Sequence, residues 1–242
     1  MLIERTMHPS WLSNAYLVAD EPGGTGVFVD SGAPLEPLLQ AVERERLTVT
    51  HLLTTHGDPD HVAGHDELRR RFDLQVLAHP AERVDGAEPF RGGETLELGG
   101  LRVEALDTPG HSPGHLAFVV NGEVCFSADV LFRDSVGGTK DAYDDVRRSV
   151  MDVLMSLPHD LRVLPGHTEP TTIGREWNEN PIIRVWRGLD PEGSEPCRVG
   201  GREATLVAWS PDYDGKGKAW VHFAGGRNMI VGGSSIERTV PS

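Results

Sequence analysis

The sequence predicts an α/β fold in which mixed β-sheets are covered by helices. Three features of the 242-residue chain support this prediction. Short apolar runs typical of strands are interspersed with amphipathic segments that have helical spacing. Clusters of Gly and Pro separate many of these segments. The strands follow one another mostly as in hairpins, so the sheets are expected to be mixed and layered against helices.

The predicted elements follow in chain order. Strands are expected at residues 2–7, 14–19, 26–30, 49–54, 74–78, 101–106, 124–127 and 161–164. Helices are expected at residues 35–47, at about 62–72 and at 144–157, where apolar residues recur every three or four positions. Asp60 is placed to cap the second helix.

The C-terminal part has a different composition. From about Pro196 it is rich in glycine and shows no helical period, and residues 204–209, 218–223 and 228–231 read as strands. Asp214-Gly215 and Gly225-Gly226 are the turns expected between them. We therefore expect a main domain at residues 1–188 and a small β module at residues 196–242, joined by a loop.

The amino-acid composition indicates which binding partners and which cellular compartment to expect. The formal net charge is −14, and such a surface repels phosphate backbones and anionic lipids. We therefore expect no nucleic-acid and no membrane partner. Cys125 and Cys197 are the two cysteines and show no paired spacing, which favours a reducing compartment. The N-terminal segment lacks the apolar core of a signal peptide, so a cytoplasmic location is expected.

Seven His and Asp residues carry the chemical signal. The run His56-Gly-Asp-Pro-Asp-His61 holds four potential metal ligands within six residues. His111, Asp129 and His167 each follow an apolar run, so each is expected just beyond the carboxyl end of a strand. Ligands of open α/β sheets gather at that edge. The sequence therefore predicts a metal centre built from several strand ends.

Here the resemblance to a known family becomes specific. A His-x-His-x-Asp-His pattern followed by a distant His, Asp and His is typical of the metallo-β-lactamase superfamily. The segments Thr108-Pro-Gly-His-Ser-Pro-Gly-His115 and Ala128-Asp-Val-Leu-Phe132 resemble those of its glyoxalase II branch, the hydroxyacylglutathione hydrolases. Persulfide dioxygenases share much of the pattern. The resemblance spans roughly residues 10–175 and implies an αββα sandwich of two mixed sheets flanked by helices.

The resemblance also implies the ligand sets. It places His56, Asp58 and His111 at a first metal ion. A second metal ion would be held by Asp60, His61 and His167. Asp129 would bridge the two ions, which lie ~3.5–4 Å apart in such sites. A hydroxide held between the ions would be the nucleophile, and Asp60 would also accept a hydrogen bond that orients it.

Position 58 departs from the family pattern, which usually has His there. A carboxylate is a harder ligand than imidazole and adds negative charge. Asp58 thus moves the preference of the first site from zinc towards iron or manganese. Zinc remains the first choice for the two divalent ions. A single-metal enzyme with Asp58 outside the ligand set stays open.

The expected function is hydrolysis of a thioester or a related acyl ester or lactone, with a small acyl compound as the partner molecule. Glutathione is not supported by residues, because the segment Thr168-Glu-Pro-Thr-Thr172 directly after His167 has no Tyr, which the glyoxalase II enzymes place there, and the tail is not helical. One alternative is a mononuclear iron persulfide dioxygenase using His56, His111 and Asp129. Another is a member without catalysis that binds metal or a partner protein.

Three secondary expectations concern residues outside the cluster. His65 is expected to be a surface histidine of its helix, and His115 a structural residue. Tryptophans after the metal-binding part are expected to anchor the β module to its neighbour. Strand edges of the module could pair two copies of the chain, so a homo-oligomer is possible.

Overall fold

The computed structural model describes residues 1–139 and 141–238. Its first sheet is built from strands β1 to β6 in chain order. Their bounds are β1 Leu2–Met7, β2 Asn14–Ala19, β3 Thr25–Val29, β4 Thr48–Leu53, β5 Gln75–Ala78 and β6 Glu88–Pro89. The β1–β2 and β2–β3 pairs are antiparallel, whereas β3 to β6 run parallel to one another. The sheet is therefore mixed.

The second sheet has the order β14-β13-β10-β9-β8-β7 and is also mixed. Its strands are β7 Thr95–Leu98, β8 Leu101–Asp107, β9 Leu116–Val120, β10 Val124–Ala128, β13 Arg162–Pro165 and β14 Thr171–Thr172. Only β10 and β13 are paired in parallel. A two-stranded ribbon, β11 Leu131–Phe132 with β12 Ser135–Val136, follows β10.

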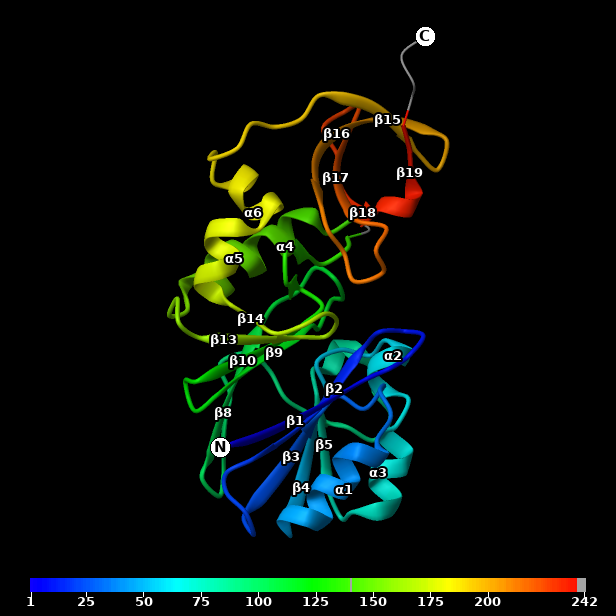
Figure 1. Ribbon diagram of the computed structural model, residues 1–242. Coiled ribbons are helices and arrows are strands. Elements are labelled where there is room, and N and C mark those ends of the chain that lie inside the picture. Colours follow the sequence, from blue (N-terminus) through cyan, green and yellow to red (C-terminus); the bar gives the residue numbers. More distant parts are fainter. Residues whose placement is uncertain (140, 239–242) are drawn as a thin grey trace.

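Helices cover the outer face of each sheet (Figure 1). On the first sheet these are α1 Glu36–Glu45, α2 Pro59–Val62 and α3 His65–Arg71. On the second sheet they are α4 Tyr143–Arg148, the π-helical turn η2 Ser149–Val153, the 3₁₀ turn η3 Leu154–Ser156, α5 Ile173–Glu179 and α6 Pro181–Trp186. A further 3₁₀ turn, η1, spans Pro80–Glu82. The two sheets and their helices form the expected αββα sandwich.

Side chains that alternate between the two faces of a strand explain how the layers pack together. In β3, Val27 and Val29 join the core between the sheets, and Phe28 joins the core beneath α1. All three side chains are at most 1% exposed. A strand that buries both faces reads as a continuous apolar run. That is why the sequence shows β3 and β4 as short apolar segments.

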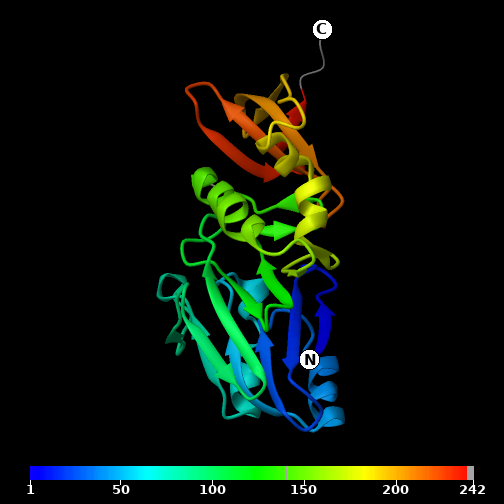
Figure 2. The ribbon, with the colours of Figure 1, turned by 90° about the vertical axis from the view of Figure 1, so that its left-hand side faces the viewer.

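The C-terminal strands form a sheet of their own, in the order β18-β17-β16-β15-β19. These are β15 Glu195–Val199, β16 Arg202–Ser210, β17 Lys218–Phe223, β18 Asn228–Gly232 and β19 Ile236–Arg238, with the 3₁₀ turn η4 at Gly233–Ser235. This C-terminal sheet lies against α4 and α6, beyond the outer helical layer (Figures 1 and 2). No described helix is long and apolar enough to cross a membrane.

Two helix predictions were wrong in detail. The helix expected at residues 62–72 is split into α2 and α3, and Asp60 lies inside α2 rather than at its cap position, which Asp58 occupies. The helix expected at residues 144–157 changes from α to π to 3₁₀ hydrogen bonding along its length. Apolar periodicity reports which face is buried, but it does not distinguish these hydrogen-bond patterns.

Candidate metal centre

Strands from both sheets end at one edge of the sandwich. His56 follows β4 of the first sheet. His111, Asp129 and His167 follow β8, β10 and β13 of the second sheet, which all run in the same direction. The remaining residues, Asp58, Asp60 and His61, come from the loop after β4 and from α2. The structure thus brings all seven predicted residues to the same edge.

The ligand atoms form three overlapping groups, within each of which the atoms lie no more than 4.8 Å apart. The groups are His56–Asp58–His111, His56–His61–Asp129 and Asp60–His61–His167. Asp129 links the two ends of the cluster: its Oδ1 lies 3.4 Å from His61 Nε2, and its Oδ2 lies 3.4 Å from His167 Nε2 and 3.8 Å from His111 Nε2. This central position is the one that a bridging carboxylate requires.

Several of these atoms are buried without a hydrogen-bond partner. They include His56 Nε2, His61 Nε2 and Asp129 Oδ1. Unpaired buried polar atoms are costly, so their convergence needs an explanation. A set of imidazole nitrogens and carboxylate oxygens directed at one another fits divalent metal ions. The residues present therefore fit the metal ions that the sequence pattern implies.

Close packing at the centre depends on a glycine. A Cβ atom at Gly166 would lie 2.0 Å from Asp129 Oδ1 and 2.9 Å from His61 Cε1. Any larger residue at position 166 would collide with Asp129 and His61. The Pro165-Gly166-His167 sequence is therefore required by the close approach of β13 to Asp129.

Burial and neighbouring charges shift the pKa values of the candidate ligands. Burial and the neighbouring His61 hold the pKa of His56 well below its usual value. Burial alone would lower the pKa of His61, but Asp129 and Asp30 raise it to about 9. Burial opposes ionisation of Asp129, yet His167 and His61 hold its pKa well below the usual range. Opposed pKa shifts of neighbouring groups thus meet at one buried carboxylate, a pattern typical of functional sites.

A second layer of side chains fixes the ligands. Asp30 accepts hydrogen bonds from His61 Nδ1 at 2.8 Å, from the Thr55 amide at 2.9 Å and from the Thr55 hydroxyl at 2.7 Å. His115 contacts Thr108 Oγ1 through Nδ1, and its Nε2 accepts a hydrogen bond from the Asp129 amide. Bonds of this kind set the tautomer and orientation of metal-binding histidines. His115 thus has the structural position expected for it.

His65 differs from the prediction of a surface histidine. It is 4% exposed, and its ring nitrogens lie 2.7 Å from Ser31 Oγ and 2.8 Å from Thr54 Oγ1. Burial lowers its pKa to about 4. The residue faces the sheet because α3 begins at His65, after a break that the periodicity did not reveal.

Sequence reasoning missed Tyr213, which lies between β16 and β17 of the C-terminal sheet. Its ring stacks on His167 with centroids 4.0 Å apart and planes 10° from parallel. Lys218 lies 5.3 Å from the centre of the same ring and forms an ion pair with Asp212 at 3.0 Å. No spacing in the sequence connects residue 213 with residue 167, so only the folded chain shows this contact.

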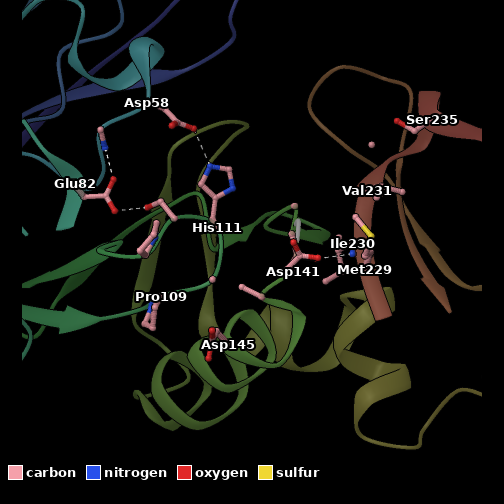
Figure 3. A pocket seen from close by; sticks show the side chains of 18 residues that line it. Asp58, Glu82, Pro109, His111, Asp141, Asp145, Met229, Ile230, Val231 and Ser235 are labelled. Atoms are coloured by element: carbon pink, nitrogen blue, oxygen red, sulfur yellow. Dashed lines mark hydrogen bonds and ion pairs between the residues drawn. The ribbon is translucent and has the colours of Figure 1, made fainter. Parts of the chain in front are cut away.

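A cavity of about 1010 Å³ opens beside the centre. Asp58 and His111 lie on one side of it, and Met229, Ile230 and Val231 of β18 lie on the other (Figure 3). His111 Nε2 lies 3.3 Å from Asp58 Oδ2 within this wall. The volume is sufficient for a small organic molecule that reaches from the ligands to the C-terminal sheet.

Known proteins are similar in fold and in sequence to the part of the chain that holds the metal centre. A sequence profile of the metallo-β-lactamase superfamily matches residues 9–167. Hydroxyacylglutathione hydrolase GloC of Haemophilus influenzae is 31% identical over 209 residues, which cover 76% of this chain and 98% of that protein. Hydroxyacylglutathione hydrolase of Rhizobium meliloti is 33% identical over 210 residues, covering 70% of this chain and 81% of that protein.

A solved structure supports the same assignment. The crystal structure of TTHA1623 in a di-iron-bound form has a TM-score of 0.61 and 33% identity, covering 73% of this chain and 98% of that one. The profile match ends at residue 167, before the C-terminal sheet begins at Glu195. The fold, the order of the ligands and these similarities agree: the chain belongs to the metallo-β-lactamase superfamily, in its glyoxalase II-like branch.

Proposed function

We propose that this protein is a metal-dependent hydrolase of thioesters or of closely related acyl esters and lactones. The observation that carries the proposal is the convergence of seven His and Asp residues around unpartnered buried atoms. The similarity to two hydroxyacylglutathione hydrolases supports acyl transfer from a thiol to water as the reaction class.

Each ligand has a proposed position. His56, Asp58 and His111 would hold one divalent ion, and Asp60, His61 and His167 would hold the other. Asp129 would contact both, in line with its distances to residues of either group. Ions in such a site lower the pKa of a water molecule towards about 7 and polarise a substrate carbonyl.

The chain's own residues orient the reactants. Asp60 Oδ2 lies 3.5 Å from His167 Nε2 and 3.7 Å from His61 Nε2, so its carboxylate faces the centre. We assign Asp60 the role of accepting a hydrogen bond from the attacking water, in addition to its role as a ligand. The substrate carbonyl would enter from the cavity side, past His111 and Asp58.

Asp58 influences which metal is bound. Its carboxylate makes the first ligand set harder than one with three imidazoles. We propose zinc as the first choice at the two sites, with iron or manganese as competitors. The di-iron form of the TTHA1623 structure shows that a related protein accepts iron.

The proposal is tested by metal analysis of protein purified without added metal, combined with thioester hydrolysis. We expect two ions per chain and hydrolysis in the wild type. Asp129→Ala should lose both metal and activity, because one carboxylate links both groups. The matched control is Asp152→Ala, which removes an exposed carboxylate and should change neither. Normal metal content and turnover in Asp129→Ala would overturn the assignment.

Iron-dependent oxygenation of a persulfide is a second candidate. The observation that favours it is the carboxylate at position 58 beside His56 and His111, since iron accepts mixed imidazole and carboxylate ligands. One iron per chain, together with oxygen consumption on a persulfide and no thioester hydrolysis, would replace the hydrolase proposal with this one.

A further inference from the structure

His167 is held differently from His56 and His61, the two candidate ligands whose rings have no exposed surface. His61 Nδ1 lies 2.8 Å from Asp30 Oδ2, and His56 Nδ1 lies 3.0 Å from Thr55 Oγ1. A hydrogen bond at the second ring nitrogen normally sets the orientation of a metal-binding histidine. His167 Nδ1 is buried as well, but no described residue forms a hydrogen bond with it. Its ring therefore depends on other contacts for its orientation.

Two aromatic rings pack against the imidazole of His167. Tyr213 stacks on it, with centroids 4.0 Å apart and planes 10° from parallel. Phe132 of β11 meets it in a T-shaped arrangement, with centroids 5.8 Å apart. Phe132 and Tyr213 also contact each other, again at 5.8 Å and T-shaped. The three rings form one cluster, in which His167 is 2% exposed.

The stacked ring restricts how the imidazole can turn. Carbon atoms are in van der Waals contact at about 3.5–4.0 Å. A parallel ring at 4.0 Å therefore blocks rotation of the His167 imidazole about its Cβ–Cγ bond. In the orientation that remains, His167 Nε2 lies 3.5 Å from Asp60 Oδ2 and 3.4 Å from Asp129 Oδ2. The stack thus keeps the ligand nitrogen directed at both carboxylates.

The loop that carries Tyr213 is attached at its base. It connects β16, which ends at Ser210, with β17, which begins at Lys218. Asp212 and Lys218 form an ion pair at 3.0 Å, and their side chains are only 4% and 8% exposed. Ser210 Oγ lies 3.1 Å from Ser135 Oγ of β12. The loop is therefore attached both to its own sheet and to the two-stranded ribbon of the main domain, which fixes where the ring of Tyr213 lies.

We propose that Tyr213 is a positioning residue for the metal ligand His167, so that the C-terminal sheet completes the site formed by Asp60, His61 and His167. Stacking on Tyr213 takes the place of the hydrogen bond that orients His61 in the same site. This inference rests on the metal ligands of the hydrolase proposed above. It gives a role in metal binding to the C-terminal sheet, which begins beyond the end of the profile match.

The test compares Tyr213→Leu with Tyr213→Phe. Leucine removes the planar ring but keeps an apolar side chain, whereas phenylalanine keeps the ring and removes only the hydroxyl. Phe223→Leu is the matched control, because it removes a ring that is 3% exposed from the core within the C-terminal sheet itself. Tyr213 is only partly buried, so the control should lose more stability than Tyr213→Leu in urea unfolding.

Metal affinity is the readout, measured on the full chain by competition between the protein and a chromophoric chelator for zinc. We expect Tyr213→Leu to bind one of two ions about three- to tenfold more weakly than the wild type, the range that corresponds to the loss of one aromatic contact. The Kd of the other ion should stay within about twofold. Tyr213→Phe and Phe223→Leu should bind both ions like the wild type. A loss that is confined to one ion and restored by phenylalanine does not follow from a damaged fold.

The other outcomes separate this inference from the hydrolase proposal. Unchanged zinc affinity in Tyr213→Leu, or the same loss in Tyr213→Phe, would overturn the positioning role of the ring and leave the hydrolase proposal intact. If Tyr213→Leu does not fold, Tyr213→Ile takes its place with the same expected loss. Weaker zinc binding in Tyr213→Leu, together with a wild type that hydrolyses no thioester, would support the positioning role and contradict the hydrolase. A wild-type chain that binds no zinc, iron or manganese would overturn both.

Discussion

His65 lies one layer behind the metal centre, where its protonation affects stability. Its ring contacts Ser31 and Thr54, and burial lowers its pKa to about 4. An unfolded histidine has a pKa near ~6.5. Between these values the unfolded chain binds a proton that the folded chain excludes. The free energy of unfolding therefore rises with pH, and the contribution of neutral His65 is lost as pH falls from 6.5 towards 4.

The prediction concerns His65→Gln. The free energy of unfolding of the wild type should fall more steeply than that of the variant below pH 6.5, by up to about 1.4 kcal/mol per pH unit. Urea unfolding at several pH values between 4.5 and 7.5 measures both slopes. His159→Gln, at an exposed position, is the control and should run parallel to the wild type. Parallel curves for His65→Gln would show that His65 is not excluded from protonation.

At the residue scale, the sequence pattern predicts that Asp58 lies beside His56 and His111, and its role as a ligand stays a prediction. It occupies the second ligand position of the pattern, and the structure places its Oδ2 3.7 Å from His56 Nε2 and 3.3 Å from His111 Nε2. His65 could not be assigned in this way. The burial of His65 depends on the break between α2, which ends at Val62, and α3, which begins at His65. The spacing of apolar residues does not show that break.

At the scale of elements, strand ends and the loops after them form the metal centre. The loop after β3 contributes Asp30, which is 2% exposed and adopts a positive φ of 55°. Its carboxylate accepts hydrogen bonds from Thr55, just after β4, and from His61 of α2, and so connects these two elements. The loop thus determines how two consecutive elements present their ligands.

Replacing Asp30 with Asn should weaken metal binding about 10–100-fold, because an amide cannot accept all three hydrogen bonds that orient His61 and Thr55. Competition with a chromophoric chelator measures the metal Kd. Asp20→Asn is the control: Asp20 also accepts backbone N–H groups, from Gly100 and Thr25, but at the opposite end of β3. That variant should lose stability and keep its metal affinity. Equal metal affinities for the wild type, Asp30→Asn and Asp20→Asn would contradict the positioning role of Asp30.

Elements differed in how well their sequences predict them. β1, β2 and β17 lie where their apolar patterns predicted. β9 was missed although all five of its residues are buried, because an apolar run of that length, directly after the Pro-Gly-His motif, has no period to identify it. The change from α4 to a π turn was also beyond prediction, since both patterns bury the same face.

At the scale of the whole molecule, aromatic side chains join the C-terminal sheet to the helical layer. Trp220 of β17 is 6% exposed, stacks on Tyr143 of α4 at 5.4 Å and lies 6.4 Å from Trp186 of α6. Trp186 donates a hydrogen bond to the Tyr143 hydroxyl. Trp186 and Trp220 thus have the anchoring role expected of the tryptophans, and these contacts hold β18 in place across the cavity.

Trp220→Ala should lower the free energy of unfolding by about 3–5 kcal/mol, the usual cost of removing a large buried aromatic side chain. Urea unfolding followed by circular dichroism measures the loss. Trp209→Ala is the comparison, because Trp209 is 38% exposed and its removal should cost clearly less than that of Trp220. A similar, small loss in both variants would indicate that the sheet is held by other contacts.

The sequence by itself determined the α/β class and the seven candidate ligands, of which His56, His111, Asp129 and His167 were predicted to follow strands, because ligand types at the ends of apolar runs are visible in one dimension. The division at about residue 188 remains a prediction. Only the tertiary structure decided that Tyr213 stacks on His167 and that β18 faces the metal centre across a cavity. Those contacts join segments more than 40 residues apart, and neither partner carries a periodic pattern that specifies the other.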